Sequence, residues 1–82
     1  MTSNAQRVEA ACGECQFGLA GDGCDLAVRI GGVAYFVEGT GIDDHGDAHA
    51  RDGLCNAIRY ADVEGHVVNG RFVARSFRLV AS

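Results

Sequence analysis

The sequence predicts a mainly β domain with one short helix, in the order β-β-β-α-β-β, which is the element order of a small OB-like five-stranded barrel. Three observations support this fold class. Apolar and polar residues alternate over several short stretches, which is typical of half-buried strands. Glycines and an Asn-Gly pair separate these stretches, and the chain contains no proline. One segment instead repeats its apolar residues at helical spacing.

The first three strands are expected at residues 7–17, 24–30 and 33–37. The second strand has the clearest alternation, with an apolar residue at every other position. Residues 18–23, between the first two strands, contain three glycines and an aspartate, which favour a loop. The pair Gly31-Gly32 tolerates positive φ and predicts a tight hairpin turn between the second and third strands.

A short helix is expected at residues 51–60, with Asp52 as its N-cap. Its apolar positions recur at i, i+3, i+4 and i+7, as Leu54, Ala57, Ile58 and Ala61. This segment supplies the single α element between the third and fourth strands.

The last two strands are expected at residues 62–68 and 71–80. Asn69-Gly70 between them is the strongest hairpin signal in the chain. The apolar phase of the fifth strand slips between Ala74 and Phe77, which predicts a β-bulge.

The length of 82 residues predicts one domain. We expect a flexible N-terminus at residues 1–6 and a single OB-like domain at residues 7–82. A domain of this size buries little apolar surface, so disulfides or a structural metal ion are common additions.

The charge of the chain bears on its partners. The net charge is −4, and all seven basic residues are arginines. We expect no nucleic-acid partner, because phosphate binding needs a concentrated basic surface. The one basic group, Arg71, Arg75 and Arg78, is expected to be a solvated strand face.

No stretch reaches the ~18 apolar residues of a membrane span, so we expect no membrane association. The sequence identifies no protein partner and leaves a homo-oligomer open.

The first residues bear on the compartment. Residues 1–7 have neither the basic start nor the apolar stretch of a signal peptide. The chain as it stands is expected in the cytoplasm, and it would be exported if a signal peptide had been removed and Met1 added. Reduced cysteines in the cytosol favour metal or redox roles, whereas an oxidising compartment favours disulfides.

The main candidates for chemistry are the four cysteines, Cys12, Cys15, Cys24 and Cys55. Cys12 and Cys15 form a C-x2-C pair, whose thiolates can both reach one ion, as in zinc knuckles. No second pair of this kind occurs, so Cys24, Cys55, His45 or His49 would complete the ligand set. Zinc is the first choice for a closed thiolate and imidazole site, and Cu(I) is the second because soft thiolates favour it.

Two other roles for the cysteines stay open. Two structural disulfides would leave no metal site, and four cysteines allow three pairings. A bridge such as Cys24–Cys55 would tie the expected helix to the barrel. A thiol-redox role of Cys12 or Cys15 is the other alternative. A thioredoxin-type site is disfavoured, because residues 16–23 should not form the helix that such a motif opens.

The densest run of other ligand-type side chains is residues 43–49. His45 and His49 are four positions apart, so on a helix they would share a face and could bind one ion. Asp44 or Asp47 could orient an imidazole by accepting a hydrogen bond from the ring nitrogen that does not bind the ion. The alternative is a solvated loop in which the histidines point to water. The spacing fits neither an H-E-x-x-H metalloprotease nor an EF-hand.

Four motifs together carry a resemblance: CGxCQF at 12–17, GCDLAVRI at 23–30, DDHGDAH at 43–49 and GxCNAIR at 53–59. As a set they resemble small bacterial cysteine-rich single-domain proteins that form a family of unknown function. Gly32 and Val33 differ from the Asp/Gly-Lys turn of that family. The resemblance implies a shared site at these motifs and an N-terminal leader in many members, and it implies no particular activity.

These observations predict a non-enzymatic metal-binding domain. The alternatives that stay open are an exported interaction module stabilised by two disulfides and a thiol-redox protein.

Overall fold

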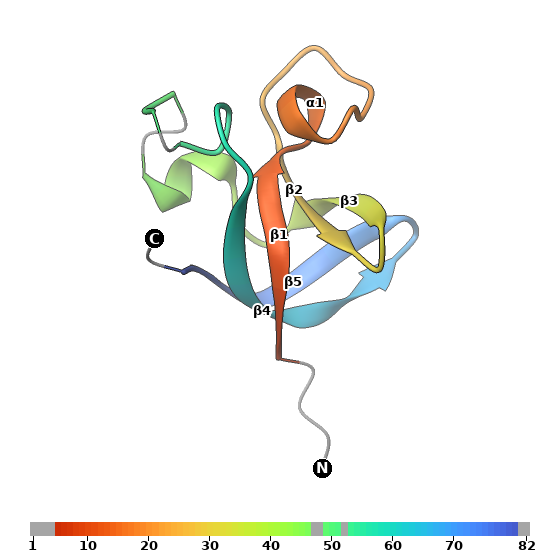
Figure 1. Ribbon diagram of the computed structural model, residues 1–82. Coiled ribbons are helices and arrows are strands. Elements are labelled where there is room, and N and C mark those ends of the chain that lie inside the picture. Colours follow the sequence, from red (N-terminus) through yellow and green to blue (C-terminus); the bar gives the residue numbers. More distant parts are fainter. Residues whose placement is uncertain (1–4, 47–48, 52, 81–82) are drawn as a thin grey trace.

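The computed structural model describes residues 5–46, 49–51 and 53–80, and these form a five-stranded barrel (Figure 1). Its strands are β1 (Gln6–Cys12), β2 (Leu26–Ile30), β3 (Val33–Glu38), β4 (Arg59–Val68) and β5 (Arg71–Leu79). The helical elements are α1 (Gly13–Gln16) and the 3₁₀ helix η1 (Ile42–His45). β1 begins at Gln6, one residue before the expected start of the domain. No helix in the described part of the chain is long and apolar enough to cross a membrane.

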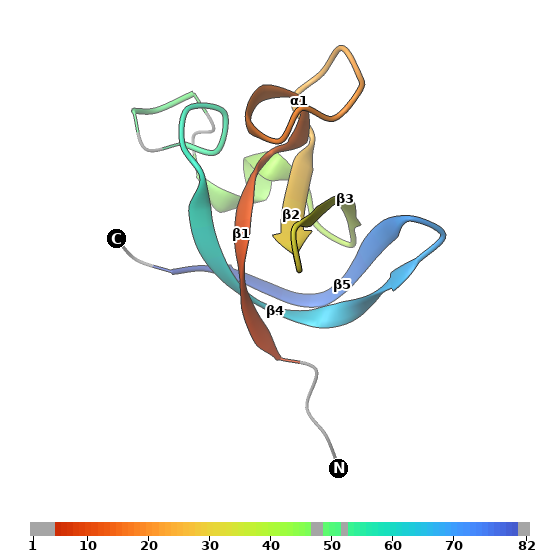
Figure 2. The same cartoon turned by 45° about the vertical axis from the view of Figure 1, so that its right-hand side comes forward.

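The strands close in the order β1-β2-β3-β5-β4, with β1 and β4 completing the barrel (Figure 2). The β3–β5 pair is parallel, and the other four pairs are antiparallel. The predicted fold class, a mainly β barrel with one short α-helix, is therefore confirmed.

Both predicted hairpin turns are present. Gly31 and Gly32 have φ of 60° and 86° between β2 and β3, and Asn69 and Gly70 have φ of 52° and 78° between β4 and β5. Two successive residues with positive φ match the right-handed twist of the strands that they join. The local sequence was sufficient here because only glycine and asparagine adopt this backbone readily.

The predicted bulge in β5 is also present. Glu64 of β4 faces Ser76, whereas the next residue, Gly65, faces Ala74, so Arg75 is the extra residue. Gly65 has a φ of 157°, and a Cβ at this position would overlap the carbonyl oxygen of Val73. Glycine therefore allows the two strands to approach each other at the bulge.

The predicted helix at residues 51–60 is wrong. Leu54 to Asn56 form a turn, and β4 already begins at Arg59. Ala61, which the helical pattern placed on one face with Leu54, instead pairs with Val8 of β1. Pairing with β1 recruits residues 59–61 into the sheet and overrides the helical spacing. The expected cap, Asp52, lies outside the described residues.

The core is built largely from small side chains. Phe72, Leu54, Val28, Val63 and Cys12 are the largest of the fully buried side chains. Four alanines are completely buried beside them, namely Ala10, Ala11, Ala27 and Ala61. A core of this kind leaves little apolar area per residue to stabilise the fold.

Cross-strand ion pairs cover part of the outside of the barrel. Arg29 binds both carboxylate oxygens of Glu9, at 2.7 and 2.8 Å, across the β1–β2 ladder. The three C-terminal arginines also lie near carboxylates: Arg71 near Glu38, Arg75 near Glu64 and Arg78 near Asp62. Each positive charge of this group therefore has a negative charge within 4 Å.

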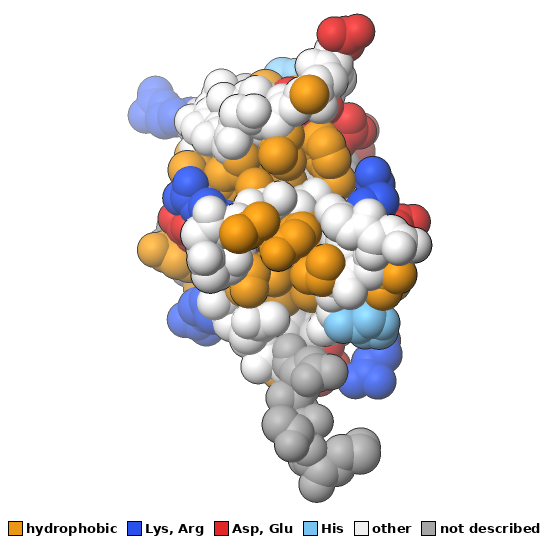
Figure 3. All heavy atoms as spheres, turned by 90° about the vertical axis from the view of Figure 1, so that its right-hand side faces the viewer, with side chains coloured by type: hydrophobic (Ala, Val, Ile, Leu, Met, Phe, Trp, Pro, Cys, Tyr) orange, Lys and Arg blue, Asp and Glu red, His pale blue; other side chains and the backbone are white. Residues whose placement is uncertain are grey.

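Hydrophobic side chains also gather on one face of the barrel (Figure 3). The β2–β3 and β4–β5 hairpins extend to this side in Figure 1. Val33, Val67 and Val68, at the ends of these hairpins, are 50%, 44% and 40% exposed. None of these three valines lies on a strand that contains a cysteine.

Candidate metal centre

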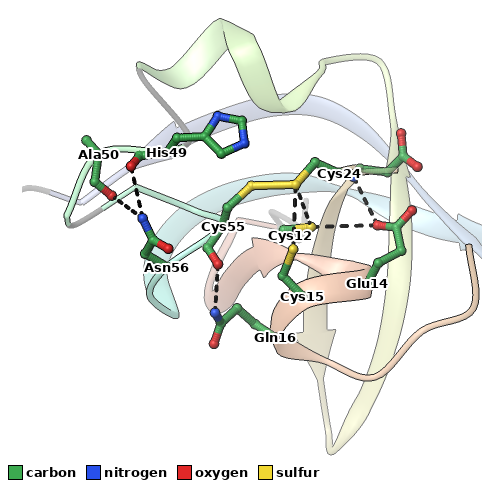
Figure 4. The surroundings of a disulfide bond; sticks show 10 residues. Cys12, Glu14, Cys15, Gln16, Cys24, His49, Ala50, Cys55 and Asn56 are labelled. Carbon is green, nitrogen blue, oxygen red and sulfur yellow. Dashed lines mark hydrogen bonds between the residues drawn. A yellow bond between two sulfur atoms is a disulfide. The ribbon is translucent and has the colours of Figure 1, made fainter. Parts of the chain in front are cut away.

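The four cysteine side chains converge at the end of the barrel that carries α1 (Figure 4). Their sulfur atoms all lie within 4.8 Å of one another. The Sγ atom of Cys24 is 3.3 Å from that of Cys12 and 3.6 Å from that of Cys15. We call these four residues the cysteine cluster. Among the described residues, this is the one group of Cys, His, Asp and Glu side chains compact enough to surround a single ion.

Three separate segments bring the cysteines together. Cys12 is the last residue of β1 and the N-cap of α1, which contains Cys15. Cys24 precedes β2 by two residues, and Cys55 lies in the turn before β4. Cys12 and Cys55 are buried, Cys24 is half-buried and Cys15 is exposed. The cluster is thus closed toward the core and open toward solvent on the side of Cys15.

Hydrogen bonds that involve no sulfur hold these segments in register. The backbone N–H of Cys12 donates to the carbonyl of Leu54 at 2.8 Å, and that of Gly13 donates to the carbonyl of Asp25 at 2.8 Å. The Gln16 side-chain amide donates to the carbonyl of Cys55, also at 2.8 Å. The backbone segments that carry the four cysteines are therefore held together by bonds that do not depend on the chemical state of the thiols.

Gly13, the glycine of the C-G-E-C motif, is required by packing. A Cβ at this position would lie 2.8 Å from Leu19 Cδ1, 2.8 Å from Phe36 Cε1 and 3.0 Å from Ala27 Cβ. Carbon atoms in ordinary contact are about 3.5–4.0 Å apart. Glycine lets α1 rest directly on β2 and β3, which places Cys15 next to Cys24.

The structure pairs Cys24 with Cys55 as a disulfide and leaves Cys12 and Cys15 as free thiols. The Cα atoms of the pair are 6.9 Å apart. One bridge is therefore present where the disulfide interpretation of the sequence expects two. The predicted example, a Cys24–Cys55 bridge, is the one observed, although it ties down a turn and not the expected helix.

A carboxyl pair lies beside the cluster. Glu14 Oε1 accepts hydrogen bonds from the Cys12 thiol at 3.7 Å and from the Asp25 backbone N–H at 3.0 Å. Burial is the main cause that raises the pKa of Cys12. A hydrogen bond to the Glu14 carboxylate raises the pKa of Asp25. Both shifts favour the protonated forms of these two side chains.

A family model matches residues 6–80 of the chain, a range that includes all four cysteines. The chain belongs to the family of unknown function DUF6370. This agrees with the resemblance to a family of unknown function, while the bacterial origin stays a prediction. No curated protein and no solved structure matches the chain.

His45 and Asp44 have other contacts in the structure. The His45 ring lies 4.5 Å from the ring of Phe77, and its Nε2 atom is 2.9 Å from the Thr40 hydroxyl. The Thr40 hydroxyl is also 3.1 Å from Asp44, so it links the carboxylate to the imidazole. Burial lowers the pKa of His45, although the nearby Asp44 opposes this shift. His45 therefore contributes to the packing around η1.

His49 is exposed and precedes the turn that carries Cys55. Its backbone carbonyl accepts a hydrogen bond from the Asn56 amide at 3.0 Å. In the view of Figure 4 its imidazole ring is turned toward the Cys24–Cys55 pair. The cluster of four ligand atoms consists of cysteines alone. Asp47, the other expected orienting carboxylate, lies outside the described residues.

The expected first strand at residues 7–17 is too long, because β1 ends at Cys12. The residues after Cys12 do form a helix, α1, but it has only one turn and ends at Gln16. The glycine-rich residues that follow prevent a longer helix. The sequence gives Gln16 no role beyond its place in the CGxCQF motif, because its partner, the Cys55 carbonyl, is 39 residues away along the chain.

Proposed function

We propose that this domain, when its four thiols are reduced, binds one zinc ion through Cys12, Cys15, Cys24 and Cys55. The observation that carries this proposal is the convergence of four sulfur atoms within 4.8 Å of one another. Four thiolates at about 2.3 Å from one zinc ion lie about 3.8 Å from each other. The two sulfur separations around Cys24, 3.3 and 3.6 Å, are close to that spacing.

The arrangement of the ligands supports a non-enzymatic role. Four cysteines fill the tetrahedral sphere of zinc, which leaves no open position for a substrate or an activated water. Cu(I) is the second candidate ion, because thiolates also suit this soft metal. Since four sulfurs suffice, His45 and His49 are not part of the ligand set that we propose.

Two features weigh against the alternative functions. A thiol-redox enzyme with Cys12 as its nucleophile needs an exposed thiol with a depressed pKa, whereas Cys12 is buried and this burial raises its pKa. A purely structural role with two disulfides would leave no free thiols, whereas Cys12 and Cys15 are both unpaired. A metal ion uses all four residues at once.

The test is metal analysis of the reduced protein, purified without a histidine tag or chelator. We expect about one zinc ion per chain by elemental analysis and by native mass spectrometry. Cobalt substituted for zinc should give the visible absorption of a tetrahedral thiolate site. A folded, fully reduced protein that binds neither zinc nor Cu(I) would contradict the proposal.

Two variants sharpen this test. Cys15→Ser removes an exposed ligand without disturbing the core, and it should weaken zinc binding strongly while the protein stays folded. His49→Ala, at an exposed residue of the same region, is the matched control and should leave the affinity unchanged. If His49→Ala lost zinc binding and Cys15→Ser kept it, the proposed set of ligands would be wrong.

A further inference from the structure

The sulfur of Cys24 takes part in two arrangements that exclude each other. It lies in the cluster, near the sulfurs of Cys12 and Cys15, and it is also bonded to the sulfur of Cys55. A metal ligand must be a thiolate, and a sulfur in a disulfide is no longer one. The bridge and the four-cysteine metal site therefore cannot exist together.

Both arrangements fit the same backbone. The hydrogen bonds from Cys12 N to Leu54 O, from Gly13 N to Asp25 O and from Gln16 to Cys55 O involve no thiol. They are all present in the structure, in which Cys24 and Cys55 are bonded. Exchange of one state for the other thus requires small movements of sulfur atoms and no refolding of the barrel.

In the oxidised state, Cys12 and Cys15 remain as free thiols, and they are the other two ligands of the proposed site. Cys12 and Cys15 keep their places next to Cys24, but two thiolates alone do not complete a zinc sphere. Metal affinity should fall at least about a hundredfold, because half of the ligands are lost and the loss of a single outer-shell partner already costs about 10–100-fold.

We propose that the cysteine cluster is a redox-controlled metal site, in which a low-molecular-weight disulfide oxidises Cys24 and Cys55 and so expels the ion. The proposal rests on the function proposed above and adds its regulation.

The Cys24 thiolate, the more accessible of the two, attacks the small disulfide, forms a mixed disulfide and releases one small thiolate. The Cys55 thiolate then attacks the Cys24 sulfur, forms the Cys24–Cys55 bond and releases the second small thiolate. Two electrons pass to the oxidant, and zinc leaves as Zn²⁺. Cys12 and Cys15 each take up a proton as they lose the ion.

The experiment uses the full chain loaded with zinc and treated with oxidised glutathione. Released zinc is followed with a chromogenic chelator, and free thiols are alkylated before peptide mapping without reduction. We expect one zinc ion released for each Cys24–Cys55 bond formed, with Cys12 and Cys15 alkylated. Reduction with a phosphine followed by added zinc should restore the metal-bound protein.

Cys12→Ser and Cys55→Ser are the matched pair of variants. The metal-free Cys12→Ser protein should still form the Cys24–Cys55 bond. Cys55→Ser cannot form it and should give only a mixed disulfide or a bond from Cys24 to one of the two nearby thiols, Cys12 and Cys15. The proposal is overturned if zinc-loaded wild type keeps its ion after full oxidation, or if release accompanies a Cys12–Cys15 bond. A reduced protein that binds no zinc at all, yet still forms the Cys24–Cys55 bond, would instead refute the proposed function itself.

Discussion

A single added methyl group at Gly13 should destabilise the protein and loosen the cysteine cluster. In Gly13→Ala the new Cβ would lie 2.8 Å from Phe36 Cε1 and from Leu19 Cδ1, and 3.0 Å from Ala27 Cβ. The Leu19 side chain can rotate, since it is only half-buried. The Phe36 ring is also half-buried and can turn aside, whereas the Cβ of the fully buried Ala27 can retreat only if β2 or α1 shifts.

The expected cost follows from two opposing effects. Overpacking of a tight site costs about 1–3 kcal/mol. Replacement of glycine by alanine in a helical backbone recovers about 0.4–1 kcal/mol, because the unfolded chain is restricted. The net loss should be about 1–2 kcal/mol. Each kcal/mol lowers the Tm of a domain of this size by about 4–8 °C.

Urea denaturation of the reduced, metal-free protein measures this loss directly. Gly23→Ala is the matched control, because its Cβ would meet nothing closer than Asp25 Oδ2, at 3.4 Å, and its φ is not positive. It should change the free energy of unfolding by less than about 0.5 kcal/mol. A Gly13→Ala protein as stable as wild type would refute the packing explanation for the glycine of the motif.

Three further outcomes follow from the structure. Gln16→Ala removes the hydrogen bond to the Cys55 carbonyl, so it should lower the free energy of unfolding by about 0.5–1.5 kcal/mol. It should also weaken zinc binding in a competition titration, although every sulfur remains. An unchanged affinity would show that this bond does not position the site. Gly65→Ala forces a side chain into the facing carbonyl of β5 at a φ of 157°, and thermal unfolding should reveal a loss of more than about 2 kcal/mol; a Tm equal to that of wild type would count against it. The hydrogen bond from Arg7 lowers the pKa of Asp62 below its ordinary value of 3.8, so this pair stabilises the fold above about pH 4 and is lost as the pH falls through the lowered pKa. Asp62→Asn should therefore flatten the fall in stability below about pH 4, and an unchanged acid titration would contradict the assignment.

The parts of the fold that sequence predicts well are those decided by local backbone chemistry. Gly31-Gly32 and Asn69-Gly70 fix two hairpins, because few residues other than glycine and asparagine adopt positive φ readily. The helix at 51–60 fails for the opposite reason. Its apolar spacing is a local signal, but pairing of Arg59 to Ala61 with β1 is a tertiary interaction that the spacing does not contain.

In the candidate site, too, the sequence predicts what depends on residue type and not what depends on tertiary contacts. The sequence predicts the cysteines as ligands, and the barrel does bring Cys55 to the three that surround the first loop. It could not predict which sulfurs would approach most closely, because that depends on the contacts of α1 with the barrel. Nor could it predict that the Thr40 hydroxyl and the ring of Phe77 would hold His45.

The location of the cluster explains why one fold can accommodate two states of its thiols. The turn that carries Cys55 is not part of the sheet, and it is held by the burial of Leu54 and by hydrogen bonds to Cys12 and Gln16. With a core made mostly of small side chains, a further link at this point adds stability that packing alone does not provide. A metal ion and a Cys24–Cys55 bond both anchor the same turn to the same end of the barrel. In the proposed switch the ion would be lost on oxidation while the fold is kept, because the new covalent bond would replace the link that the metal supplied.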